Sequence, residues 1–133
     1  MRVRRPQRTA PESLVTIAPA RGSHRVSAAQ RRTAEQAIAK LPVADRALIA
    51  RLGLRVQLIP ASALEDGMLG ATTVVRDAQG RMVATAIRVA SRLDGTGVDS
   101  LAEVVQHELG HVISVERHQD SSERAAQQYA RTH

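Results

Sequence analysis

The sequence predicts a single α+β domain in which a small, largely antiparallel three-stranded sheet packs on helices. Two segments with helical periodicity precede three strand-like segments, and two more helical segments follow them. The length of 133 residues suits one small domain. Hydrophobic residues make up 43% of the chain but aromatic residues only 1%, so we expect a core of aliphatic side chains.

The net charge of +6 is concentrated at the start of the chain. Residues 1–32 hold eight arginines and one glutamate, a net charge of +7, so residues 33–133 sum to −1. Residues 1–24 contain three prolines and no sustained period. We therefore predict a basic, disordered leader over residues 1–24 and a folded domain over residues 25–133.

Two helices are expected after the leader. Ser27 can cap a helix that runs to Lys40, on which alanine, isoleucine and leucine recur at helical spacing, and Pro42 ends it. A shorter helix follows over residues 43–52. Gly53 then offers a left-handed stop.

Three strands come next. Residues 54–60 alternate apolar and polar side chains, which is typical of a strand with one wet face. Residues 71–76 and 81–90 are rich in threonine and valine and flank a polar, glycine-containing turn at 77–80. This pattern predicts a β-hairpin.

Two helices complete the domain. Asp99 or Ser100 can cap the first, whose continuous apolar stripe reaches about Arg117. Residues 120–123, which read Asp-Ser-Ser-Glu, resemble a capping box and begin a last helix that ends near Arg131.

The first of these helices contains the sequence His-Glu-Leu-Gly-His at residues 107–111. His107 and His111 lie one turn apart on the same face, so both imidazoles can reach one metal ion. The chain has no cysteine, so the site must use nitrogen and oxygen ligands, and we predict zinc. Glu108 can sit beside a zinc-bound water and take its proton as it attacks a carbonyl. Gly110 makes most sense where another element packs on the helix backbone.

A catalytic zinc ion needs a third protein ligand. The candidates after the motif are Glu116, His118, Asp120, Glu123 and His133. Glu123 is favoured, because it starts a helix that can fold back antiparallel on the motif helix, with small alanines where the two would touch. His118 and Asp120 remain alternatives, and Glu123 could instead serve only as a helix cap.

Residues 107–111 resemble the HExxH signature of zincin metallopeptidases. Residues 123–130, which read Glu-Arg-Ala-Ala-Gln-Gln-Tyr-Ala, resemble the third-ligand helix of gluzincins, including the ImmA/IrrE-like families. The strand, hairpin and helix before them are similar to the minimal fold of those domains and of lethal-factor-like peptidases. The resemblance covers about residues 50–131.

This resemblance implies zinc bound by His107, His111 and Glu123, with Glu108 as general base. Gln127 stands where those families usually have a carboxylate or asparagine. The implied setting is either a cytoplasmic protease that acts on a regulator or the peptidase domain of a phage or secreted effector.

Peptide hydrolysis requires further parts of a site. We predict that residues 83–90 form the strand that holds an extended substrate through main-chain hydrogen bonds. Tyr129, the only phenol, is the candidate to stabilise the oxyanion, with His118 as another option and simple packing as the other interpretation of Tyr129. Gly95 and Gly97 could let the loop before the motif helix move over the cleft, or the loop could be a plain connector.

The predicted function is zinc-dependent metalloendopeptidase activity on a protein or peptide substrate. Two other classes stay open: a metal- or protein-binding module that keeps the fold without turnover, and a nucleic-acid-binding protein that uses its basic tail. We do not expect nucleic-acid binding, because the basic segment has no aromatic residue to stack on bases. No apolar run is long enough for a signal peptide or a membrane span, so we expect neither a Sec signal nor membrane insertion.

Overall fold

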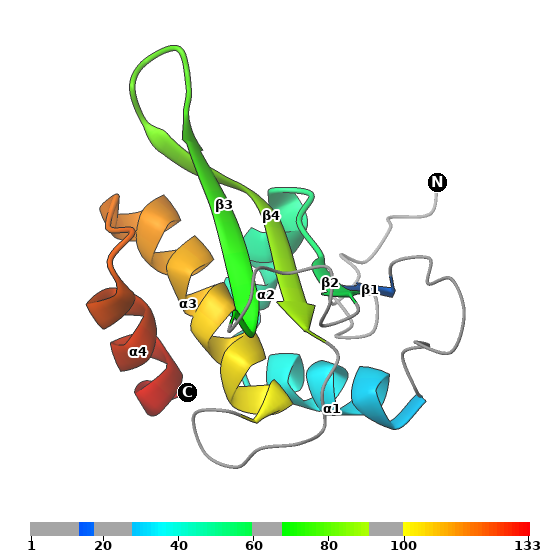
Figure 1. Cartoon of the computed structure of the whole chain (residues 1–133). Helices are drawn as coiled ribbons and strands as arrows, with labels where there is room; N and C mark the ends of the chain where they lie inside the picture. Colours follow the sequence, from blue (N-terminus) through cyan, green and yellow to red (C-terminus); the bar gives the residue numbers. More distant parts are fainter. Residues whose placement is uncertain (1–13, 18–27, 60–67, 91–99) are drawn as a thin grey trace, which may run out of the picture.

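A computed structural model describes residues 14–17, 28–59, 68–90 and 100–133 of the chain. The described residues form four helices and four strands, which confirms the α+β class (Figure 1). In chain order the elements are β1 (Val15–Ile17), α1 (Ala28–Ala39), α2 (Val43–Arg51), β2 (Val56–Ile59), β3 (Gly70–Arg76), β4 (Met82–Ala90), α3 (Leu101–His118) and α4 (Glu123–Thr132).

The sheet is mixed and has the strand order β1-β2-β4-β3. β1 pairs with β2 and β2 with β4 in parallel, whereas β3 and β4 form the predicted antiparallel hairpin. The prediction of a three-stranded, largely antiparallel sheet is therefore wrong in strand number and in the direction of most pairings. The pattern of apolar and polar side chains along each segment predicted the hairpin strands and β2, but such a pattern does not show which strands pair with one another.

β1 lies inside the segment predicted as a disordered leader. Its residues pair with β2 from Val15 opposite Val56 to Ile17 opposite Leu58, and Leu14 and Val15 are buried. The predicted boundary at residue 24 is therefore wrong for residues 14–17. A three-residue strand is too short to show a period, so nothing distinguished it from the surrounding proline-containing segment. The rest of the predicted leader and the loop with Gly95 and Gly97 lie outside the described residues.

Most local signals for helix ends and turns agree with the structure, but the capping box predicted at residues 120–123 is wrong, because Ser122 is the N-cap of α4 and Glu123 contacts two histidines instead of the helix backbone. The predicted cap at Ser27 lies outside the described residues. Gly53 after α2 has a φ of 72°, in the left-handed region. In the hairpin turn, the Asp77 carboxylate accepts hydrogen bonds from the backbone N–H groups of Gln79 and Arg81, both at 2.9 Å. The N-cap of α3 is Ser100, and that of α4 is Ser122; each hydroxyl accepts a hydrogen bond from a first-turn N–H at 3.2 Å.

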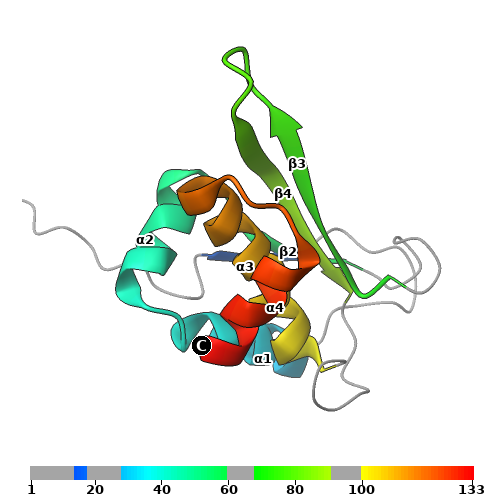
Figure 2. The ribbon, with the colours of Figure 1, turned by 90° about the vertical axis from the view of Figure 1, so that its left-hand side faces the viewer.

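The helices gather on one side of the sheet, and the β3–β4 hairpin projects past them (Figure 2). α3 lies against β3 and β4 and also contacts the other three helices. Its buried stripe joins a core of aliphatic side chains, as predicted; the largest fully buried ones are Ile38, Ile49, Leu58, Ile87 and Leu109. None of the described helices is long and apolar enough to cross a membrane.

α4 folds back against α3, as its alanines suggested, and the close approach depends on Gly110. A Cβ atom at Gly110 would lie 2.9 Å from the backbone oxygen of Ala126 and 3.0 Å from the Cβ of Tyr129. Ala126 is fully buried at this contact. Glycine therefore stands in the middle of a helix, where it normally weakens the structure, because a side chain would push the two helices apart.

Candidate metal centre

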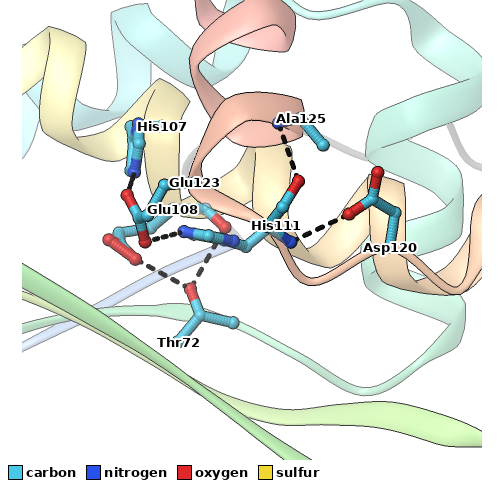
Figure 3. A network of polar contacts seen from close by, with 8 residues as sticks. Thr72, His107, Glu108, His111, Asp120, Glu123 and Ala125 are labelled. Atoms are coloured by element: carbon cyan, nitrogen blue, oxygen red, sulfur yellow. Dashed lines mark hydrogen bonds and ion pairs between the residues drawn. The ribbon is translucent and has the colours of Figure 1, made fainter.

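α3 presents His107 and His111 on one face, with their ring centroids 5.0 Å apart. The chain reverses after α3, and the first residue of α4, Glu123, returns to these two rings (Figure 3). Glu123 Oε2 lies 2.7 Å from His107 Nε2, and Glu123 Oε1 lies 2.8 Å from His111 Nε2. One ligand atom from each residue falls within 4.8 Å of the others, so the three predicted ligands come together.

The two alternative ligands do not join this group. His118 is exposed at the end of α3. The Asp120 carboxylate accepts a hydrogen bond from the backbone N–H of Ser122 at 2.9 Å, and hydrogen bonds from Ser122 lower the pKa of Asp120. Among the described residues, the only cluster suited to a metal ion is His107, His111 and Glu123.

Glu123 is poised to carry a negative charge. Partial burial raises its pKa, but hydrogen bonds and charge interactions with His107 and His111 outweigh that effect and leave the pKa below its ordinary value. The carboxylate is therefore ionised at neutral pH. An ionised carboxylate and two imidazoles with converging ring nitrogens form a nitrogen- and oxygen-only ligand set.

Glu108 occupies a different environment beside this cluster. Its side chain is only 6% exposed and lies against β3, where the Thr72 hydroxyl is 3.0 Å from Glu108 Oε1 and 3.2 Å from the Glu108 carbonyl oxygen. Burial raises the pKa of Glu108, and the nearby His111 and the Thr72 hydrogen bond only partly oppose that rise. Glu108 is thus a shielded carboxyl next to the ligands, outside the ligand group itself.

Gly70 makes room for Glu108. A Cβ atom at Gly70 would lie 2.9 Å from the Cγ of Glu108 and 2.9 Å from Val104 Cγ1. The sequence analysis did not single out Gly70, and Thr72 was only one residue of the predicted strand 71–76, so both contacts with Glu108 went unpredicted. A glycine at a strand start is a weak sign of close packing, and nothing in the sequence singled out Thr72 from its neighbours.

A cavity of about 700 Å³ opens over these residues. Three parts of the chain line it: β3 and the residues before it, α3, and the turn with α4. The lining residues are Met68, Leu69, Gly70, Ala71, Thr72, Val74, Glu103, Val104, His107, Glu108, His111, Ser121, Glu123, Gln127, Ala130 and Arg131. The cluster therefore lies in a cleft whose one wall is a β-strand.

That strand is not the one predicted for substrate binding. Residues 83–90 belong to β4, whose hydrogen bonds are shared between β2 on one side and β3 on the other. β3 has a neighbouring strand on one side only within the described sheet, and β3 lines the cleft. Residues 83–90 precede the motif helix in sequence, but the first strand of the hairpin takes the edge position in space.

Tyr129 points away from the cluster. Its hydroxyl donates a 2.6 Å hydrogen bond to Asp45 Oδ2, and the other oxygen of this buried carboxylate pairs with Arg117 at 2.6 Å. Burial, followed by the bond to Asp45, raises the pKa of Tyr129. Tyr129 is not among the residues that line the cleft. These contacts do not bring Tyr129 to the cluster of His107, His111 and Glu123, and they support the interpretation of Tyr129 as a packing residue.

Two imidazoles and one carboxylate, with space on one side, match the protein ligands of catalytic zinc sites. Comparison of the chain with known proteins found no matching family, no matching curated protein and no matching solved structure. The chemistry of the cleft is therefore inferred from its own side chains.

Proposed function

We propose that the protein is a zinc-dependent peptidase in which His107, His111 and Glu123 hold the metal and Glu108 acts as general base. The observation that carries this proposal is the convergence of three ligand atoms within 4.8 Å, beside a separate buried carboxyl, in an open cleft. The similarity of residues 107–111 to the zincin signature supports the same assignment.

The residues fit zinc better than a hard cation. Imidazole nitrogens suit zinc, whereas calcium and magnesium prefer oxygen ligands throughout. Zinc bound here would polarise a peptide carbonyl and lower the pKa of water at its open position. The exposed side of Glu123 and the cleft leave space for a substrate to approach.

Glu108 is suited to move the proton. Burial shifts the pKa of Glu108 upwards, towards neutral pH. A carboxylate with such a pKa can accept a proton from the attacking water and return it to the leaving amine. The hydrogen bond from Thr72 holds Oε1, and among the described residues no donor bonds Oε2, which would leave Oε2 for the transfer. Both steps use one carboxyl group, and no second base is needed.

A protein or peptide in an extended conformation is the substrate class that the cleft suits. The edge of β3 that has no neighbouring strand among the described residues can pair with such a chain through main-chain hydrogen bonds, which would place a peptide bond across the cluster. A wall made of a strand edge favours an extended chain over a small molecule. We therefore propose cleavage inside a chain, as by an endopeptidase.

The test compares wild-type protein with Glu108→Gln. This substitution keeps the shape of the side chain, but an amide cannot accept the proton. We therefore expect zinc to bind at one ion per chain while cleavage of a peptide library falls by about 10²–10⁴-fold. His118→Ala, which removes an exposed imidazole outside the cluster, should change neither quantity.

Unchanged cleavage by Glu108→Gln would refute the mechanism. Zinc binding by wild-type protein without cleavage of any peptide would favour the other function class, a metal-binding module with this fold. Metal content and mass-spectrometric analysis of products, measured on the same preparations, separate these two outcomes.

A further inference from the structure

The turn between α3 and α4 is fastened to the hairpin by one side chain, that of Gln119. Its Oε1 accepts a hydrogen bond from the backbone N–H of Met82 at 2.7 Å, and its Nε2 donates to the Met82 carbonyl at 2.9 Å. Nε2 also donates to the carbonyl of Val115 at 2.8 Å. The amide thus pairs with Met82 as a neighbouring strand would, while it also caps the last turn of α3.

Gln119 makes these three hydrogen bonds while its backbone is in an unfavourable conformation. Its φ is 52°, and among the described residues it is the one non-glycine residue with a positive φ. Helices commonly end with a residue in this left-handed conformation, and glycine is the usual choice there because it has no Cβ atom. A long side chain at such a position needs a reason, and the three hydrogen bonds of the amide supply one.

The location of this contact connects it with the metal centre. Gln119 follows α3 directly, and Glu123 lies four residues later at the start of α4. Met82 starts β4, whose partner β3 forms the wall of the cleft. The Gln119 side chain therefore fixes the turn before Glu123 relative to the hairpin that lines the cleft.

We propose that Gln119 is a positioning residue that sets the place of Glu123 relative to His107 and His111. This inference rests on the proposed role of Glu123 as a metal ligand. The contact acts through the backbone of the turn, since Gln119 is not among the residues that line the cleft. Without these hydrogen bonds, the turn is no longer attached to the sheet. Glu123 would then lie beside both imidazoles for a smaller fraction of the time.

A second contact nearby provides a matched control. Arg81 Nη2 lies 2.9 Å from the carbonyl oxygen of Glu116 and 3.3 Å from its carboxylate, so it ties the same end of the hairpin to α3. This contact reaches the helix before the turn begins. Arg81→Ala therefore loosens the hairpin from α3 without altering the link to the turn.

The experiment measures zinc affinity by competition with a chromogenic chelator, using full-length protein. Gln119→Asn keeps an amide and tolerates the left-handed conformation, but it is one methylene too short to reach Met82. Gln119→Gly removes the backbone strain together with the side chain. We expect both variants to bind zinc about tenfold more weakly than wild type and Arg81→Ala to bind it normally.

Cobalt(II) bound in place of zinc gives a second readout, because its visible absorption reports the ligands and their geometry. If Gln119 positions Glu123, the spectrum of Gln119→Asn should shift towards that of Glu123→Ala. A role confined to capping α3 would change the unfolding temperature and leave the spectrum and the affinity as in wild type, which would overturn the proposal. Gln119→Gly serves the same test if Gln119→Asn does not fold.

Failure of the proposed function gives a different result. If Glu123→Ala binds zinc as tightly as wild type, the ligand set itself is wrong, and the proposal for Gln119 falls with it. If Glu123→Ala binds zinc weakly while both Gln119 variants bind it normally, the ligand set stands and only the positioning role is refuted.

Discussion

Glu108 and Glu123 are the same residue type, and their surroundings give them different tasks. Burial raises the pKa of Glu108, whereas contacts with two imidazoles lower the pKa of the exposed Glu123. Carboxyl groups whose pKa values are shifted in opposite directions suit separate roles. The one with the higher pKa can exchange a proton, and the one with the lower pKa stays ionised and can hold a cation.

Thr72 offers a test of how Glu108 is oriented. Thr72→Val keeps the shape of the side chain but removes the hydroxyl that bonds Glu108 Oε1. We expect kcat for peptide cleavage to fall about tenfold at unchanged zinc content, because the carboxyl loses the contact that fixes it. Steady-state kinetics with a fluorogenic peptide provide the measurement.

Two controls accompany this variant. Thr72→Ser keeps the hydroxyl and should retain most of the wild-type kcat. Thr73→Val alters the next residue of β3, whose side chain points to the other face of the sheet, and should have little effect. A loss of kcat in Thr72→Ser with none in Thr72→Val would show that the methyl group, and not the hydrogen bond, matters.

Contacts between site residues could be predicted from the sequence only where the two residues lie close together along the chain. The spacing of His107 and His111 on one helix face is local, so helical geometry alone brought them together. Glu123 needed only the reversal of one turn. Thr72 lies 36 residues from Glu108, and no local pattern connects the two. Contacts of that kind arise from the tertiary packing of β3 on α3.

α4 brings Glu123 to the site and packs mainly against α3. Ala126 is its one buried residue, at the close approach to Gly110. Tyr129 makes a second contact, because its hydroxyl bonds the buried Asp45 of α2, which also pairs with Arg117 of α3. A buried carboxylate with both a hydrogen-bond donor and a cation is satisfied, and here it joins three helices.

Tyr129→Phe tests whether this tyrosine anchors α4 or takes part in catalysis. Loss of a hydrogen bond to a charged, buried group should lower the free energy of unfolding by about 1.5–3 kcal/mol. The zinc-loaded enzyme should keep kcat within about twofold, because the hydroxyl faces Asp45 and not the cleft. Urea denaturation and peptide cleavage under native conditions measure the two quantities. A large loss of kcat at unchanged stability would instead return Tyr129 to the role of oxyanion donor.

At the scale of the whole molecule, α3 organises the fold. One face of this helix is buried on the sheet, and the other carries the imidazoles towards the cleft and α4. Its apolar stripe predicted the first of these contacts. The strand order of the sheet could not be predicted from the sequence. The short β1 pairs in parallel with β2, and β4 lies between β2 and β3, and both arrangements depend on contacts between residues distant in sequence.

This arrangement makes α4 the element whose docking should respond most to metal. Zinc that binds only the folded protein stabilises it by about 2.7 kcal/mol at one hundred times its dissociation constant. For a domain of this size, that corresponds to a rise of roughly 10 °C in the melting temperature. Because Glu123 is the proposed ligand from α4, zinc should also slow amide hydrogen exchange in α4 more than in α1, which contributes no residue to the cluster.

Calorimetry and hydrogen-exchange mass spectrometry, with and without zinc, measure both effects on one preparation. Glu123→Ala should lose most of the rise in melting temperature and all of the added protection in α4, while the His107→Ala variant should lose the rise because the α3 side of the site is then incomplete. An undiminished rise in both variants would place the zinc elsewhere in the chain. A rise in wild type without protection of α4 would mean that metal binding does not join α4 to α3, and the three-residue ligand set would then be wrong in its third member.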